Sequence, residues 1–217
     1  PYTDRPLPAF KCVPRGLKEE LTKFRPLSQA NQPFGDSVND GIDKVAHIAL
    51  ARGEDIDRRI QSCYRRTGEV WMAKRDVKGA YRTMMVRPED WHLQGICWNG
   101  SYYIDKFMSF GCRSSVDQWL RFADALEWCL ARWGVHAVHY VDDFIFIAGS
   151  EAECKEQLRK FRAICESWGV ELKVITDCGP AKVMNALGVE YDLTKMTKRI
   201  TPGRIEQLDE MLVEART

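Results

Sequence analysis

The stretch Val135–Ala148 reads Val-His-Ala-Val-His-Tyr-Val-Asp-Asp-Phe-Ile-Phe-Ile-Ala. It contains two runs of β-branched and aromatic residues, which favour strands, interrupted by the adjacent acids Asp142 and Asp143. Adjacent carboxylates repel one another and lower strand propensity, so the interruption indicates a turn. The stretch therefore predicts a β-hairpin with Asp142 and Asp143 at its tip.

A third acid ends another predicted strand upstream. Residues 69–77 have a strand-forming composition, and Gly79 permits a bend directly after them. Asp76 is therefore expected near the carboxyl end of this strand. An isolated Asp-Asp pair usually makes only a tight turn, because Asp is a common turn residue, but that interpretation leaves Asp76 unexplained.

Three acids of this kind predict a metal site. Carboxylate oxygens are hard ligands, and Mg²⁺ usually takes one or two carboxylates together with substrate phosphates. We expect Asp76 and Asp142, with Asp143 beside them, to hold two Mg²⁺ ions about 3.5 to 4 Å apart, with Mn²⁺ as an alternative. Such a pair of ions activates an attacking hydroxyl group and stabilises a leaving pyrophosphate.

Composition narrows the range of functions. The 217 residues, 45% of them hydrophobic, suffice for one sizeable core or for two small lobes that share a cleft. Lys plus Arg number 32 and Asp plus Glu 31, so the net charge of +1 gives no bulk electrostatic argument for nucleic-acid binding. The eight cysteines lack CxxC spacing, which argues against structural zinc. No run approaches the ~18 apolar residues of a membrane span. We therefore expect an intracellular protein of the cytoplasm or nucleus, with free thiols and no membrane partner.

Other patterns complete the predicted secondary structure. Asn99-Gly100 between two short apolar runs predicts a tight hairpin. Ser150 and Glu153 form a capping box before a helix that ends near Gly169. The remaining predicted elements are a helix at Ser115–Trp133, a helix-compatible stretch at Gly41–Thr67, and strands at Val170–Ile175 and Ala186–Ile200. Their order predicts an α+β fold in which helices back an antiparallel sheet.

The motifs together resemble those of reverse transcriptases. Tyr140–Asp143 (Tyr-Val-Asp-Asp) looks like the family's YxDD signature, and Asp76–Tyr81 (Asp-Val-Lys-Gly-Ala-Tyr) is similar to its upstream DVxxAY/F motif, in the same order and spacing. Between them, Phe107–Gly111 resembles the family's Pro-Phe-Gly or Pro-Gln-Gly segment, with Ser109 where Pro is frequent. The resemblance extends from about Lys11 to Arg204.

Flanking segments add to this resemblance. Lys23–Ser28 and Gly35–Ile42 look like the fingers segment in the form found in DIRS-like retrotransposons, so the chain is most similar to reverse transcriptases of DIRS-like and LTR-type retrotransposons. Leu187–Asp192 resembles the primer-grip hairpin at the end of the palm.

The resemblance implies a right-hand polymerase with a ferredoxin-like palm sheet and interleaved fingers. The implied divisions are fingers at 1–70, the first metal-ligand strand of the palm at 71–84, a fingers or palm hairpin at 85–108, palm at 109–200, and the start of a thumb or connection at 201–217. The implied activity is that of an RNA-directed DNA polymerase, which makes DNA from dNTPs on an RNA template or a DNA primer/template. A longer natural polypeptide, with thumb and RNase H domains, is expected.

The resemblance also implies roles for individual residues. Asp76, Asp142 and Asp143 are the implied catalytic acids and, with Val77, the implied metal-binding residues. Tyr81 matches the bulky steric gate that rejects a ribose 2′-hydroxyl. Residues implied in dNTP binding are Lys23, Arg25, Val77, Tyr81, Phe110 and Gly111, and residues implied in primer grip or template contact are Tyr140, Leu187 and Gly188.

One family residue has no clear counterpart, and two other functions stay open. The lysine that protonates pyrophosphate is unassigned, because Lys173 comes early after Gly169 and Lys182 comes late. An RNA-directed RNA polymerase is disfavoured by Tyr81, since such enzymes need room for the 2′-hydroxyl group. A catalytically inactive, palm-derived scaffold that binds nucleic acid is disfavoured by the acids, because a scaffold has no need of costly clustered carboxylates.

Overall fold

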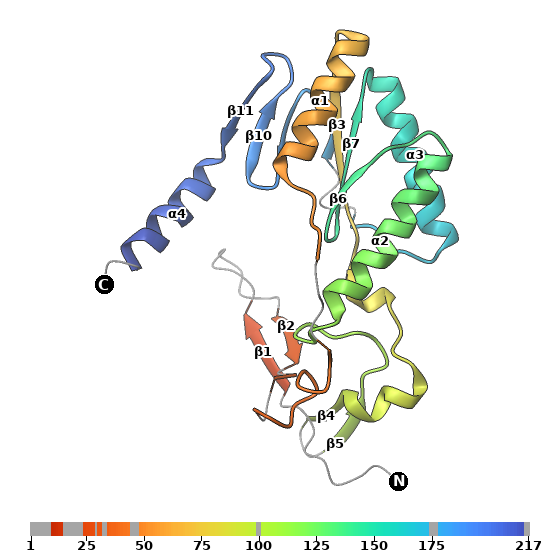
Figure 1. Ribbon diagram of the computed structural model, residues 1–217, viewed down its shortest axis with the longest axis vertical. Helices are drawn as coiled ribbons and strands as arrows, with labels where there is room; N and C mark the ends of the chain where they lie inside the picture. Colours follow the sequence, from red (N-terminus) through yellow and green to blue (C-terminus); the bar gives the residue numbers. More distant parts are fainter. Residues whose placement is uncertain are drawn as a thin grey trace. The chain divides into compact units, whose positions relative to one another are not determined.

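The computed structural model describes residues 10–14, 24–28, 30–31, 34–43, 48–98, 101–173 and 178–214, and among them side chains from residue 30 onward except those of 97 and 98. The chain forms two compact units that are interleaved along the sequence (Figure 1). One unit comprises Pro1–Ala49 and Gly79–Phe122, and the other comprises Leu50–Lys78 and Ala123–Thr217. We call them the discontinuous N-terminal unit and the sheet unit.

The sheet unit is built on a four-stranded antiparallel sheet. Its strand order is β6-β7-β3-β8, where the strands are β6 (Val138–Tyr140), β7 (Asp143–Ala148), β3 (Trp71–Asp76) and β8 (Cys178–Ala181). Helix α1 (Gly53–Thr67) covers one face, and α3 (Glu151–Ser167) with the later part of α2 (Ser115–Arg132) covers the other (Figure 1). The predicted α+β fold is therefore present.

Strand β7 is buried on both faces because its side chains alternate between two cores. Phe144 and Phe146 pack against Phe161 of α3, with ring centroids 4.9 and 5.1 Å apart. On the opposite face, Ile145 and Ile147 join a cluster of buried residues that includes residues of α1. The continuous apolar run after Asp143 is thus the sequence signature of a strand covered twice.

Phe161 packs against both Phe144 and Phe146, so we expect Phe161→Ala to destabilise the protein strongly. The side chain is fully buried, so its removal leaves a cavity beneath Phe144 and Phe146. The expected loss is about 3–5 kcal/mol of the free energy of unfolding, measured by urea denaturation. Phe161→Leu, which refills part of the cavity, should lose less, and equal losses for both variants would contradict this packing argument.

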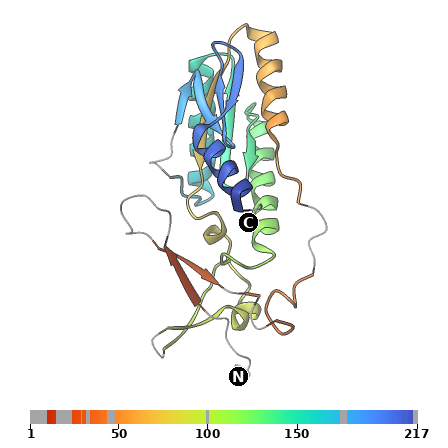
Figure 2. The same cartoon turned by 90° about the vertical axis from the view of Figure 1, so that its left-hand side faces the viewer.

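A second sheet ends the sheet unit. Its order is β11-β10-β9, formed by β9 (Val183–Ala186), β10 (Val189–Asp192) and β11 (Thr197–Ile200). Helix α4 (Pro202–Glu214) follows directly and buries none of its side chains (Figure 2). The strand material predicted at Ala186–Ile200 is therefore a hairpin that is extended by β9.

The discontinuous N-terminal unit consists of short ribbons and turns. Strand β1 (Phe10–Pro14) pairs with β2 (Phe24–Ser28), and β4 (Gly95–Trp98) pairs with β5 (Ser101–Ile104). Two 3₁₀ helices, η1 (Ala80–Thr83) and η2 (Pro88–Gln94), precede β4. The β4–β5 pairing confirms the predicted hairpin, although its turn at Asn99-Gly100 lies outside the described residues.

Two expected elements differ from the structure. Among the described residues of the stretch 41–67, which exclude 44–47, only Gly53–Thr67 is helical. Directly upstream, residues 34–42 form turns and bends, in which the Asp40 carboxylate accepts hydrogen bonds from the N–H groups of Gly35 and Ser37. In place of a strand at Val170–Ile175, the described residues 170–173 form a single bridge between Leu172 and Val77, and 174–177 lie outside the described residues.

Two further expectations concern chemistry rather than fold. Among the described side chains, the thiols of Cys63, Cys112, Cys129, Cys154, Cys165 and Cys178 are free. Burial raises the pKa of Cys154 and of Cys165 to about 12, so both thiols are unreactive at neutral pH. In the part of the chain that the structure describes, no helix combines the length and the apolar character needed to cross a membrane.

Candidate active site

Strand pairing in the sheet unit brings the three acids together. In the register of β3 and β7, Asp76 lies directly opposite Asp143, which also pairs with Tyr140 of β6. Asp142 occupies the two-residue turn between β6 and β7, and its carbonyl oxygen accepts a 2.9 Å hydrogen bond from the N–H of Val77. The predicted hairpin is confirmed, with Asp142 in the turn and Asp143 as the first residue of the following strand.

The turn that carries Asp142 is strained. Val141 has φ 51°, in the left-handed region that a β-branched residue rarely adopts. Such a conformation costs about 1–3 kcal/mol and persists where the surrounding structure enforces it, typically at functional sites. Here the enforcing contacts are the flanking β6–β7 pairs and the bond from Val77 to Asp142.

Two lysines lie against the acids. The Nζ atom of Lys173 is 2.5 and 2.6 Å from the two carboxylate oxygens of Asp76, and 3.9 Å from Oδ2 of Asp142. The Nζ atom of Lys74 is 3.2 Å from Oδ2 of Asp143. Each lysine therefore partly balances the negative charge that strand pairing concentrates at this end of the sheet.

The charge state of Asp142 reflects this crowding. Burial raises the pKa of its carboxyl group, the nearby carboxylate of Asp76 raises it further, and Asp143 adds to the same effect. A backbone hydrogen bond and the Lys173 ammonium act in the opposite direction. The net shift is upward, so ionised Asp142 is held at an energetic cost that a bound cation would relieve.

The acids suit a divalent metal in their chemistry. All their ligand atoms are carboxylate oxygens, which are the ligands that Mg²⁺ and Mn²⁺ prefer. In the described residues, however, no three His, Cys, Asp or Glu side chains already converge as a metal-binding group. At Asp76 the Lys173 ammonium binds both oxygen atoms of the carboxylate. The donor set fits the metal provided that this ammonium moves aside.

Val77 differs from these acids in having no polar side chain. Its side chain is apolar and fully buried, and its N–H already donates to Asp142. Of its polar groups, only the backbone carbonyl oxygen can act as a ligand atom.

The discontinuous N-terminal unit holds the aromatic and glycine residues of the predicted nucleotide site. Tyr81 lies on η1, and its ring meets that of Phe110 edge-on, with centroids 5.1 Å apart. Gly111 has φ 97°, a conformation that favours glycine, and its carbonyl oxygen accepts a 2.9 Å hydrogen bond from Nδ2 of Asn39. Oδ1 of Asn39 in turn accepts from the N–H of Arg113. The structure therefore places Tyr81 against Phe110 by a ring contact, and Asn39 holds the neighbouring Gly111 by a hydrogen bond.

The residues predicted for primer or template contact lie in the sheet unit. Leu187 and Gly188 form the two-residue turn between β9 and β10, both with positive φ. The Gly188 carbonyl oxygen accepts hydrogen bonds from the N–H and the hydroxyl of Thr201, just before α4. Tyr140 ends β6 beside the acids and is 37% exposed, so its ring remains accessible.

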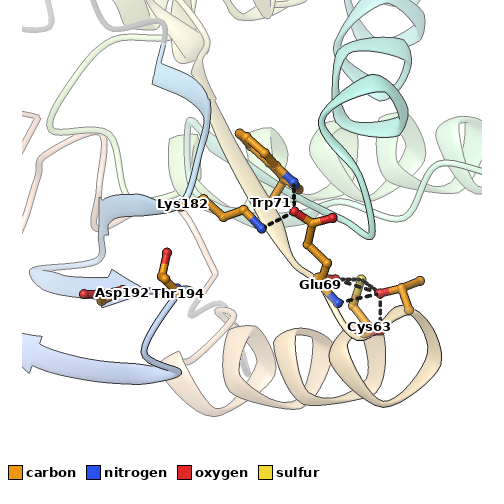
Figure 3. A network of polar contacts seen from close by, with 7 residues as sticks. Cys63, Glu69, Trp71, Lys182, Asp192 and Thr194 are labelled. Atoms are coloured by element: carbon orange, nitrogen blue, oxygen red, sulfur yellow. Dashed lines mark hydrogen bonds and ion pairs between the residues drawn. The ribbon is translucent and has the colours of Figure 1, made fainter.

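The remaining predicted residues are basic. Lys23 lies outside the described residues, and Arg25 is placed by its backbone, which pairs with Val13 in the β1–β2 ribbon. Of the two candidate lysines, only Lys173 reaches the acids. Lys182 instead binds Glu69, near the start of β3 at the opposite end from Asp76 (Figure 3).

Two residues of the site, Lys74 and Asn39, and the contact of Lys173 with Asp76 were not predicted from the sequence. Lys74 had a usable signal, because it lies two positions before Asp76 and residues i and i+2 of a strand share a face. Asn39 had none beyond its place in a turn-rich segment. Lys173 contacts Asp76 across 97 residues of sequence, and nothing local indicates that contact.

Comparison with known proteins agrees with these motifs. A family model described as reverse transcriptase (RNA-dependent DNA polymerase) matches residues 4–175. No curated protein matches the sequence.

Solved structures show the same fold. The foamy viral protease-reverse transcriptase dRH in complex with double-stranded DNA superposes with a TM-score of 0.70 at 14% identity, over 91% of this chain and 31% of that one. The foamy viral protease-reverse transcriptase with an RNA/DNA hybrid gives 0.69 at 14% identity, over 94% and 24%. These similarities confirm the predicted polymerase fold, and the chain spans less than a third of either relative.

Proposed function

The chain belongs to the reverse transcriptase (RNA-dependent DNA polymerase) family, and from that premise we propose that it extends a DNA primer with dNTPs on an RNA or DNA template. The reaction is a phosphoryl transfer, for which a protein supplies mainly positioning and charge neutralisation. The fingers-like sequence motifs favour a retrotransposon of DIRS-like or LTR type as the source. We also propose that it acts inside the cell, in the cytoplasm or nucleus.

One observation carries this proposal, which is the pairing of Asp76 with Asp143 next to the Asp142 turn. A folded protein gains nothing in stability from three carboxylates at one end of a sheet, and the raised pKa of Asp142 reflects that cost. A strained Val141 in the same turn adds to it. Sites that retain strain and repulsion together are typical of catalytic centres.

Asp76 and Asp142 are the residues that would hold the divalent metal, with Asp143 as an auxiliary acid and Val77 contributing its backbone. When bound, Mg²⁺ or Mn²⁺ would supply charge neutralisation at the attacking hydroxyl and at the leaving pyrophosphate. The part played by the protein is to hold the carboxylates in place, which the β3–β7 register and the Val77–Asp142 backbone bond do.

We assign dNTP recognition to the other unit, the proposed fingers together with the segment from η1 to Gly111. Tyr81 is the proposed sugar gate, with Phe110 and Gly111 beside it, and Lys23 and Arg25 are the proposed contacts of the triphosphate. Charge-assisted hydrogen bonds from basic side chains stabilise the negative charge that moves onto the phosphates. Leu187, Gly188 and Tyr140 are the proposed contacts of primer and template in the palm. Thumb and RNase H domains in the full polypeptide are also proposed.

Replacing Arg25 with Ala tests the triphosphate role. Loss of a charge-assisted hydrogen bond should weaken the apparent dNTP affinity about tenfold or more, with little change in the extension rate at saturating dNTP. Steady-state single-nucleotide extension measures both quantities. Lys11→Ala is the matched control, because Lys11 lies in the partner strand of the same ribbon, opposite Leu27. Equal affinity in the unaltered chain and Arg25→Ala would rule the contact out.

The experiment that tests the proposal as a whole is extension of a DNA primer on RNA and on DNA templates. Extension should require dNTPs and Mg²⁺, stop with EDTA, and proceed on both templates. Preferential use of rNTPs would instead indicate an RNA-directed RNA polymerase. Nucleic-acid binding without extension, and without metal binding at the acids, would indicate the scaffold.

A further inference from the structure

Lys173 occupies the position in the acidic cluster where a cation is expected. Its ammonium contacts both oxygens of Asp76, at 2.5 and 2.6 Å, and faces Oδ2 of Asp142 at 3.9 Å. The N–H of Lys173 donates to the Asp76 carbonyl oxygen at 2.9 Å, which ties the residue to the end of β3. Side chain and backbone therefore both hold Lys173 on the same acid.

The surroundings make this contact more than a surface ion pair. The side chains of Asp76 and Lys173 are 14% and 23% exposed, so water screens their interaction less than it screens the exposed pair of Lys78 and Glu171. Lys74 pairs separately with Asp143, which leaves Lys173 facing Asp76 and Asp142. Two of the three acids, Asp76 and Asp143, are thus each paired with an ammonium group from within the chain.

We propose that Lys173 is an internal counter-ion that a divalent metal must displace from Asp76, and that this competition sets the metal affinity of the site. The inference rests on the proposed function, since it concerns the metal site of that reaction. A metal bound to Asp76 needs carboxylate oxygens that the ammonium now holds, and two cations at one carboxylate repel each other. The lysine stem is long and flexible enough to swing away while the backbone bond stays in place.

The test compares Lys173→Met with the unaltered chain, because Met keeps an unbranched apolar stem and removes the charge. Mn²⁺ is titrated into EDTA-treated and dialysed protein, and free Mn²⁺ is followed by electron paramagnetic resonance. We expect Lys173→Met to bind Mn²⁺ about fivefold more tightly or better. We also expect the Tm of Lys173→Met to be lower than that of the unaltered chain when both are free of metal. This difference in Tm should disappear at saturating Mn²⁺.

Lys182→Met is the matched control. Lys182 is 27% exposed, lies 2.5 Å from Oε1 of Glu69, and stands over the Trp71 ring at the other end of β3 (Figure 3). The substitution removes one positive charge and one ion pair from the same unit. It should lower Tm while leaving the Mn²⁺ affinity unchanged.

The outcomes separate the inference from the proposed function. Suppose that Asp142→Asn abolishes Mn²⁺ binding but Lys173→Met does not tighten it. That result would overturn the counter-ion role and leave the metal site in place. Equal tightening in Lys173→Met and Lys182→Met would also overturn it, because net charge alone would then explain the effect. The absence of Asp142-dependent binding in every variant would overturn the metal site itself, and the inference with it.

Discussion

Primer extension by Asp142→Asn is expected to fall by at least about 10²–10³-fold, while the protein stays folded. Asn keeps the shape of the side chain and removes its charge, so a metal would lose one of its anionic ligands. The turn should survive, because the bond from Val77 goes to the backbone carbonyl of Asp142 and not to its side chain. Single-turnover extension with saturating dNTP and Mg²⁺ measures the loss.

Unlike its activity, the stability of the Asp142→Asn variant is not expected to fall. Burial and the carboxylates of Asp76 and Asp143 raise the pKa of Asp142, so its ionised form is unfavourable in the folded protein. Removing that charge should leave Tm equal or raise it in metal-free buffer, a trade of stability against activity. Glu156→Gln, at an exposed carboxylate on α3, is the control of equal charge and should leave activity unchanged. Retained extension in Asp142→Asn would refute the catalytic assignment.

Tyr81→Ala is expected to relax the choice of sugar. If the ring lies under the incoming deoxyribose, its removal makes room for a 2′-hydroxyl, and incorporation of rNTPs relative to dNTPs should rise about tenfold or more. The ratio of kcat/KM values for matched rNTP and dNTP in single-nucleotide extension measures this change.

Tyr81→Phe is the matched variant, since it keeps the ring and its edge-on contact with Phe110. It should retain the discrimination of the unaltered chain. If Tyr81→Ala excluded rNTPs as well as the unaltered chain does, the tyrosine would be a packing residue of η1 and not a gate. Loss of activity with both nucleotides would point in the same direction, toward a structural role.

Local patterns predicted those parts of the fold that neighbouring residues decide. The helix expected at Ser115–Trp133 is present as Ser115–Arg132, because its apolar residues recur at helical spacing. The hairpin around Asp142 follows from two strand-forming runs and one charged interruption. The capping pair was also anticipated, since the Ser150 hydroxyl accepts from the N–H of Glu153, although the Glu153 carboxylate reaches Gly149 instead of the cap residue.

Where local signals were weak, the expected elements did not form over their whole predicted length. The stretch from Gly41 was compatible with a helix, but the described helix begins at Gly53. The segment after Gly169 was expected to be a strand, yet its described residues form one isolated bridge, between Leu172 and Val77, together with the backbone bond from Lys173 to Asp76.

The sequence alone identified the family, the three acids and the hairpin that presents two of them, because each depends on residue types at short, fixed spacing. It did not reveal that Asp76 faces Asp143, since strand register is decided by packing on both sheet faces. Nor did it reveal the contact of Lys173 with Asp76, which forms only after α3 and the following turn have returned the chain to β3. Charge balance in the site is therefore a property of the tertiary structure, because Coulomb interactions depend on distance in space and not along the chain.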